Sequence, residues 1–151
     1  MTDTQTEARE DRGEANARAW LASIRKMVAA QNAIEDTEHT EAREAAERAI
    51  QKSVLSVMVR DGWREAGAES DGPVEYEILL STGGPACRIY GELDEHNEPT
   101  SAELQFQDWF TPWTALSTDD PSGTYSDEWL QEQADAQDDV LAFARCFYFG
   151  N

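Results

Sequence analysis

The spacing of apolar residues changes once along this 151-residue chain, close to residue 53. Before that point apolar side chains recur every three or four residues, which is the period of an amphipathic helix. After it they alternate with polar side chains over short segments separated by turn residues, which is the period of a half-buried strand. Together the two patterns predict an α+β fold, in which helices cover one face of an antiparallel sheet.

Two helices are predicted in the first part of the chain. The first begins near Glu14 and carries an apolar stripe made of Ala17, Trp20, Leu21, Ile24, Met27 and Val28. The second runs from about Thr40 to Ser53, and its narrow stripe consists of Ala42, Ala45, Ala46, Ala49 and Ile50. Small residues of this kind permit close helix packing, so we expect a helical hairpin over residues 13–53. The polar residues 1–12 are expected to form a disordered tail.

The second part, residues 54–151, is predicted to be an acidic α+β domain built on an antiparallel meander of about four strands. The strands fall at 54–60, 74–80, 86–93 and 101–109, and residues 111–116 could add a short edge strand. The expected core side chains of the sheet are Ile78, Leu80, Ile89, Leu93, Leu104 and Phe106. A C-terminal helix packed on one face is predicted from Trp129, Val140, Leu141, Ala144 and Phe147, and it should end before Gly150.

Two adjacent glycines, Gly83 and Gly84, lie between the predicted strands 74–80 and 86–93. A phosphate-binding P-loop needs a helix and a lysine after its glycines. Here a strand follows, and no lysine occurs beyond Lys52. The glycines are therefore predicted to form a hairpin turn in which one of them adopts a positive φ.

Acidic residues are concentrated in the second part of the chain. Residues 1–53 hold 11 acidic and 8 basic residues, a net charge of -3, whereas residues 54–151 hold 20 and 4, a net charge of -16. Such a chain should repel nucleic acid and anionic membranes and attract basic proteins. We therefore expect neither a nucleic acid nor a membrane as a direct partner.

Four glutamates are expected to share the polar face of the meander: Glu75, Glu77, Glu92 and Glu103. They would lie about 5 Å apart across strands and about 7 Å apart along them, with no basic residue between them. That spacing is close to the spacing of phosphates along one nucleic-acid strand. The alternative is a solvated face that only keeps the protein soluble.

The segment QDWFTPWT, residues 107–114, places Trp109, Phe110 and Trp113 within five positions. These rings either form a satellite core under the loop or anchor a partner, since tryptophan is enriched in binding hot spots. Asp108 is predicted to tie the turn near Thr111 and is also counted among the partner-binding residues. The predicted C-terminal helix adds three further candidate carboxylates, those of Asp135, Asp138 and Asp139.

Catalytic interpretations have weaker support. The two histidines are His39 and His96, and a Cys87–His96 pair on one hairpin lacks a third catalytic residue. A loose cation site could involve Asp94, Glu95, His96 and Glu98, but the spacing of an EF-hand is absent. An acid–base pair of a hydrolase is left open without support. The chain is expected not to be an enzyme and to need no metal or cofactor.

The cellular location is predicted from what the sequence lacks. Cys87 and Cys146 do not have zinc-site spacing and are expected to be reduced core residues. The sequence shows no signal peptide and no apolar run of about 20 residues. We therefore expect a protein of the host-cell cytoplasm.

Residues 78–114, ILLSTGGPACRIYGELDEHNEPTSAELQFQDWFTPWT, and the later segment LAFARCFYFG resemble small acidic proteins of unassigned role from phages, plasmids and other proteobacterial mobile elements. The resemblance covers roughly residues 54–151. Its genomic setting implies an anti-defence role, as in anti-CRISPR and antirestriction proteins, many of which mimic the charge of DNA.

The predicted function is accordingly that of an anti-defence binding protein. It would inhibit a nucleic-acid-binding defence complex of the host, such as a CRISPR effector or a restriction enzyme, by occupying a nucleic-acid site. An alternative is an acidic accessory or chaperone-like module for a basic partner protein. The oligomeric state is left open.

Overall fold

The computed structural model describes residues 2–34, 40–83, 85–109, 111–117, 120 and 122–150, and for residues 2–11 and 40 it describes the backbone alone. The elements are α1 (Thr2–Asn32), α2 (Thr40–Lys52), β1 (Ser56–Asp61), β2 (Pro73–Ser81), β3 (Ala86–Glu92), β4 (Glu103–Gln107), β5 (Thr114–Ala115) and α3 (Asp127–Ala144). This order confirms the α+β class predicted from the apolar periods.

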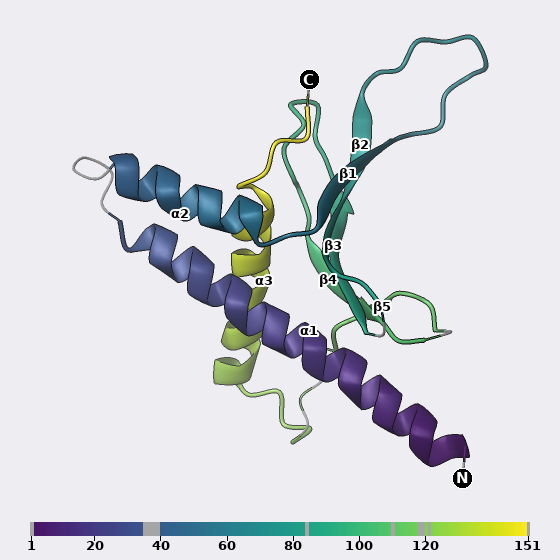
Figure 1. The fold of residues 1–151 in the computed structure, drawn as a ribbon, viewed down its shortest axis with the longest axis vertical. Coiled ribbons are helices and arrows are strands. Elements are labelled where there is room, and N and C mark those ends of the chain that lie inside the picture. The colour runs from purple at the N-terminus through teal and green to yellow at the C-terminus, as the bar shows by residue number, and fades with distance from the viewer. Residues whose placement is uncertain are drawn as a thin grey trace.

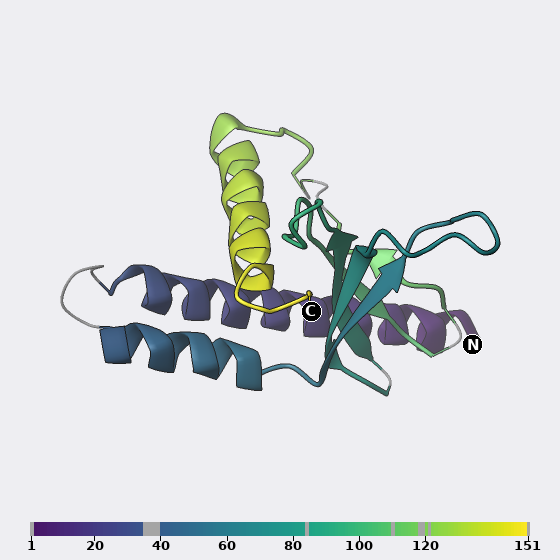
Figure 2. The same cartoon turned by 90° about the horizontal axis from the view of Figure 1, so that it is seen from above.

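The five strands form an antiparallel meander in the order β1-β2-β3-β4-β5, so each strand pairs with its neighbours in sequence. β1 and β5 lie at the two edges. The helices gather on one side of this sheet, and the loop between β1 and β2 projects away from the body (Figure 1, Figure 2). Among the described residues, no helix lies on the other side of the sheet, here called the outer face.

One hydrophobic cluster joins the helices to the sheet. Its members are Ala17, Ile24 and Val28 of α1, Ile50 of α2, Tyr76, Ile78, Leu80, Cys87, Ile89 and Leu104 of the sheet, and Val140, Phe143 and Ala144 of α3, with Leu93, Ala102, Cys146 and Phe149 from the connecting segments. The predicted inward phase of β2, β3 and β4 is therefore confirmed. Phe106 packs against this cluster but is only half-buried.

α1 begins earlier than predicted. It starts at Thr2, so its backbone is helical through most of the stretch expected to be a disordered tail. The sequence of this stretch, TDTQTEAREDR, is rich in residues with good helix propensity. Once the buried stripe from Ala17 onward holds the helix, extending it by such residues needs no new nucleus. Periodicity located the packed part of the helix and not its end.

The C-terminal helix also ends earlier than predicted. α3 stops at Ala144, and Arg145 caps it, so Phe147 lies in the tail that follows. In this tail Phe149 is buried, and its ring centroid lies 4.8 Å from that of Tyr76. The tail thus returns the chain to the sheet. An apolar residue near the end of a predicted helix, such as Phe147, does not show whether it belongs to the helix or to such a tail.

The glycine pair forms a turn, as predicted. β2 and β3 are antiparallel neighbours, and Gly83 has φ of +91° between them. Gly84 lies outside the described residues. Residues 111–116 contribute the two-residue edge strand β5, which pairs with β4.

Candidate partner-binding surface

The strand register places all four predicted glutamates on the outer face. Glu75 pairs directly with Glu92, while Glu77 pairs with Tyr90, which in turn pairs with Glu103 on its other side. Paired residues of an antiparallel sheet point to the same face. The inward neighbours Tyr76, Ile78 and Leu80 are buried, in line with this assignment.

Glu75 is held by two neighbours on this face. Arg60 of β1 forms an ion pair with its carboxylate, and the Tyr90 hydroxyl donates a hydrogen bond of 2.7 Å to Glu75 Oε2. The hydrogen bond from Tyr90 and then the one from Arg60 lower the pKa of Glu75. Both favour the ionised carboxylate. Glu75 is thus charged, but its carboxylate is already paired with Arg60 and hydrogen-bonded to Tyr90 within the protein.

Glu77 is held in a similar way by Arg88 of β3. An Arg88 terminal nitrogen lies 2.6 Å from Glu77 Oε2, and Arg88 Nε donates to Gln105 Oε1 at 2.8 Å. The guanidinium carbon lies 4.3 Å from the Trp113 ring centroid and 5.1 Å from that of Tyr90. Arginine gains cation–π stabilisation from rings at these distances. Arg88 therefore sits between two aromatic rings at the centre of the outer face.

These contacts correct the sequence analysis on one point. The outer face was expected to hold the four glutamates with no basic residue among them, and that expectation is wrong, because Arg60 pairs with Glu75 and Arg88 pairs with Glu77. Glu75 and Glu92 still face each other across β2 and β3. Arg88 was already in phase with the polar face of its strand, so its position was a usable signal. The pairing of Arg60 with Glu75 could not be predicted from the sequence, because the long connection 62–72 leaves the β1–β2 register open.

Glu92 and Glu103 are the predicted glutamates that remain most exposed. Glu103 Oε1 accepts a 2.7 Å hydrogen bond from the Gln105 side-chain amide. Among the described residues, neither Glu92 nor Glu103 forms an ion pair. These two carboxylates are better placed to meet a partner than Glu75 and Glu77.

The aromatic segment divides into a structural part and an exposed part. Asp108 is buried against α1 next to Gly13, and its backbone N–H donates to Thr111 Oγ1 at 3.1 Å. Asp108 thus contacts Thr111 through its backbone groups. That its side chain accepts from the backbone near Thr111 stays a prediction. Its place among the partner-binding residues is not supported, because burial keeps the side chain from a partner.

Trp109 and Trp113 differ in the same way. Trp109 is 58% exposed, whereas Trp113 is half-buried and packs over Arg88. Phe110 lies outside the described residues. The two interpretations of the segment thus apply to different residues: Trp113 packs on the sheet, and Trp109 is the ring presented to solvent.

α3 carries six carboxylates and no lysine or arginine in 18 residues. Asp127 and Glu128 lie in its first turn, where negative charge favours the helix dipole. Asp139 and Glu132 both pair with Arg25 of α1, at 2.9 Å from Arg25 Nε for Asp139. The hydrogen bonds that Arg25 donates, first to Glu132 and then to Asp139, raise the pKa of Arg25. These carboxylates therefore dock α3 onto α1.

Asp135 and Asp138 lie on the exposed side of α3. Asp135 accepts a 2.9 Å hydrogen bond from Gln131 one turn earlier. The two aspartates are three positions apart in the sequence, so they lie on neighbouring positions of one helix face. Of the three predicted aspartates, these two point outward, and Asp139 is used within the fold.

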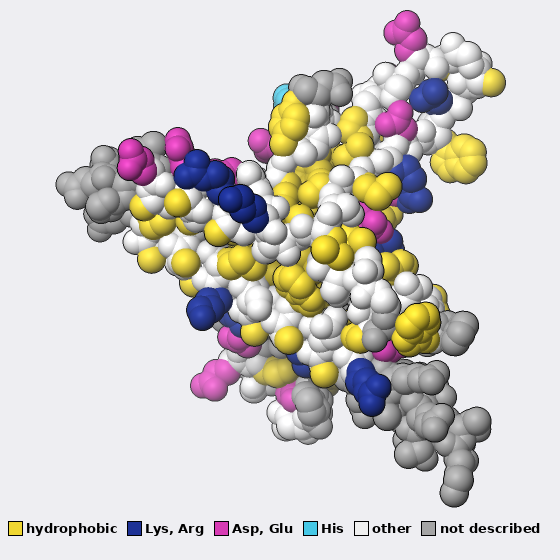
Figure 3. All heavy atoms as spheres, in the orientation of Figure 1, with side chains coloured by type: hydrophobic (Ala, Val, Ile, Leu, Met, Phe, Trp, Pro, Cys, Tyr) yellow, Lys and Arg dark blue, Asp and Glu magenta, His cyan; other side chains and the backbone are white. Residues whose placement is uncertain are grey.

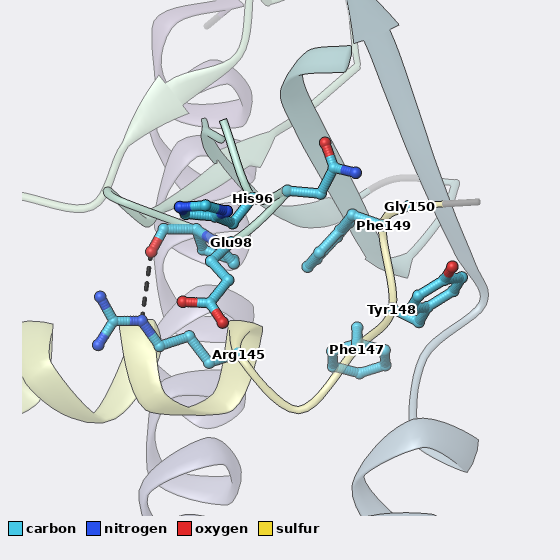
Figure 4. A pocket seen from close by; sticks show the side chains of 9 residues that line it. His96, Glu98, Arg145, Phe147, Tyr148, Phe149 and Gly150 are labelled. Carbon is cyan, nitrogen blue, oxygen red and sulfur yellow. Dashed lines mark hydrogen bonds between the residues drawn. The ribbon is translucent and has the colours of Figure 1, made fainter. Parts of the chain in front are cut away.

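A hollow of about 470 Å³ lies between the turn after β3 and the C-terminal tail. Figure 4 shows His96 and Glu98 on the turn and Arg145 at the end of α3, with three aromatic residues of the tail on the other side. Arg145 Nε donates to the Pro99 carbonyl at 3.2 Å. This bond ties the helix end to the turn.

The turn after β3 contains the residues of the loose cation site that the sequence left possible. Asp94 Oδ1 accepts backbone N–H groups of His96 at 2.8 Å and Glu98 at 3.0 Å. These bonds, that from Glu98 first, lower the pKa of Asp94. The carboxylate thus shapes the turn, and in the part of the chain described no three His, Cys, Asp or Glu side chains are placed to hold a metal ion.

The cysteines lie in the interior. Cys87 is fully buried on the inner side of β3, and desolvation raises the pKa of its thiol to about 12. His96 is exposed on the turn and lies beside Glu95. A thiol so buried holds its proton at neutral pH, which does not favour a Cys87–His96 pair. His39 lies outside the described residues.

Within the residues described, no helix has the length and apolarity needed to cross a membrane. No family model, curated protein or solved structure matches the chain. The resemblance to acidic proteins of mobile elements therefore stays a prediction from the motifs quoted above.

Proposed function

We propose that this chain is an acidic binding protein that inhibits a basic, nucleic-acid-binding defence complex of its host, such as a CRISPR effector or a restriction enzyme. Its exposed carboxylates take the place of phosphate groups in the nucleic-acid site of that complex. The protein acts by occupying the site and performs no catalysis.

The observation that carries this proposal is the charge of α3. Among the described residues, the ion pairs of its six carboxylates are those of Glu132 and Asp139 with Arg25. Asp135 and Asp138 remain exposed beyond that pair. A patch of one sign attracts a basic partner over roughly a Debye length, about 8 Å at physiological salt. It also suppresses binding to acidic surfaces by like-charge repulsion.

Glu92 and Glu103 on the outer face, and Trp109 in the aromatic segment, are further candidate contact residues in this proposal. The glutamates supply exposed carboxylates on the sheet, and the tryptophan supplies an exposed ring of the kind found in hot spots. Four other predicted residues are less available to a partner, because each is paired or buried within the fold: Glu75, Glu77, Asp108 and Asp139.

The proposal is tested in cells that carry a defined CRISPR or restriction system. Expression of the chain should raise the plating efficiency of a targeted phage, and the purified chain should compete with nucleic acid for the effector. The double change Asp135→Asn and Asp138→Asn should weaken effector binding by about tenfold, which corresponds to a few exposed charge pairs.

The matched control is the double change Asp135→Glu and Asp138→Glu, which keeps both charges and should keep most of the binding. Raising salt should weaken binding of the unchanged protein. Binding that survives the loss of both charges and is indifferent to salt contradicts the mechanism. Binding to a basic protein without loss of its nucleic-acid binding favours the accessory-module alternative.

A further inference from the structure

β1 is an edge strand, and its outer edge is open. Among the described strands it pairs with β2 alone. Alternate N–H and C=O groups of an edge strand point away from the sheet and can pair with another strand. Proteins usually guard such edges with proline, lysine, a bulge or a covering element. The regular part, Ser56–Arg60, has no proline or lysine, and its register shift comes only after Arg60.

Exposed apolar side chains gather along this edge. They are Leu55, Met58, Val59, Trp63 and Val74, here called the edge patch. Met58 is 60% exposed, and Trp63 on the projecting loop is fully exposed. In Figure 3 hydrophobic side chains are visible below that loop, interspersed with charged side chains and with backbone. Exposed apolar side chains concentrated along an open strand edge indicate an interaction site.

We propose that the edge patch is the interface of a homodimer, in which the β1 strands of two copies pair antiparallel about a two-fold axis at Met58. The two sheets then form one continuous ten-stranded sheet. This inference does not depend on the proposed function. It concerns the edge at β1 and a second copy of the chain, whereas the proposed function concerns exposed carboxylates and a basic partner.

The register follows from symmetry. A two-fold axis perpendicular to the sheet keeps the outer face of one copy continuous with that of the other, so one residue of β1 must lie opposite its own copy across the axis. Met58 is the middle residue of Ser56–Arg60. An axis there pairs all five regular residues, whereas an axis at Val57 or Val59 leaves part of the strand without a partner.

The side chains are compatible with this register. Met58 lies opposite Met58 of the second copy, Val57 opposite Val59, and Ser56 opposite Arg60. No two like charges face each other across the new pair, which would be destabilising. The apolar residues that are exposed in one copy thereby contact each other in two.

Charge at the ends of β1 favours a second copy over an unrelated strand. After β1, residues 61–72 hold four acidic residues and one basic residue, and before it Arg48 and Lys52 lie in the last part of α2. A two-fold axis brings the acidic end of one strand beside the basic end of the other. It also brings Trp63 of one copy close to Leu55 of the other, and both are exposed.

The net charge of -19 on each copy opposes association and is screened by salt. The dimer should therefore tighten as salt rises from low to physiological strength. Binding to a basic effector should weaken over the same range. The two associations are thus distinguished by the sign of their salt dependence.

Sedimentation velocity over a range of concentrations tests the dimer. The unchanged protein should be dimeric at micromolar concentrations in physiological salt. Met58→Lys places two ammonium groups opposite each other on the axis and should raise the dimer dissociation constant by about tenfold or more. Leu130→Lys changes an exposed apolar residue on α3 and should leave the dimer intact.

Cross-linking tests the register. Met58→Cys should give a disulfide-linked dimer under mild oxidation, because a residue on the axis faces its own copy. Leu130→Cys should not, and Cys87 and Cys146 are buried. A monomer at all concentrations, a dimer insensitive to Met58→Lys, or equal cross-linking of the two cysteine variants overturns the proposal. Capture of an extended basic peptide in place of a second copy also overturns it.

Discussion

At the scale of single residues, Gly13 of α1 fits closely against Asp108. A Cβ atom at position 13 would collide with the Asp108 carboxylate and with the Phe106 ring. Glycine in a helix interior is less stable than alanine by about 1 kcal/mol. The residue is thus kept against helix propensity so that the buried turn can approach α1.

Gly13→Ala should therefore destabilise the protein, by about 1–3 kcal/mol of overpacking less the gain in helix propensity. Urea unfolding measures the change. Combining it with Asp108→Ala, which removes the carboxylate, should recover part of the loss through a favourable coupling energy. A more stable Gly13→Ala protein would show that α1 and the turn are not in contact at this point.

At the scale of elements, the sheet depends on the inward residues of β4. Leu104 pairs with Ile89 on the inner face and is 5% exposed. α1 and α3 both pack against β4. The strand therefore transmits the packing of two helices to the sheet.

Leu104→Ala should cost about 2–5 kcal/mol, because it removes buried methyl groups and leaves a cavity between the helices and the sheet. Leu130→Ala on the exposed side of α3 should change stability by less than about 0.5 kcal/mol. Thermal or urea unfolding of the two variants provides the comparison. Similar small effects for both would mean that the inner face of β4 is not packed.

At the scale of the whole molecule, the charge of -19 works against the compact state through self-repulsion. Adding monovalent salt shortens the Debye length from about 30 Å at 0.01 M to about 8 Å at 0.15 M. The exposed ion pairs are weakened too, but each contributes only about 0.2–1 kcal/mol. Relief of repulsion should dominate.

The melting temperature should therefore rise with sodium chloride over this range, as followed by circular dichroism. Glu92→Gln combined with Glu103→Gln removes two exposed charges and should raise stability most at low salt. The temperature rise with salt should be smaller in that variant. A melting temperature that falls as salt is added would mean that the ion pairs of Arg25, Arg60 and Arg88 outweigh the net repulsion.

The candidate surface shows where residue patterns stop being informative. Alternation alone put Glu75, Glu77, Glu92 and Glu103 on one face, and the register agrees. Alternation could not show that Arg60 forms an ion pair with Glu75, because a long loop separates the two residues in the sequence. Likewise Asp135 and Asp139 look alike in the sequence, and only the position of Arg25 on α1 separates the exposed one from the paired one.

The sequence by itself determined the α+β class, the order of the elements, the inward phase of the strands and the turn at Gly83. Each follows from local periodicity or from backbone preference, which act over a few residues. The tertiary structure decided how far α1 extends, which carboxylates remain exposed, and that β1 leaves an apolar edge open. These depend on which distant side chains meet, because burial and ion pairing are properties of contacts between elements and not of the segments that supply them.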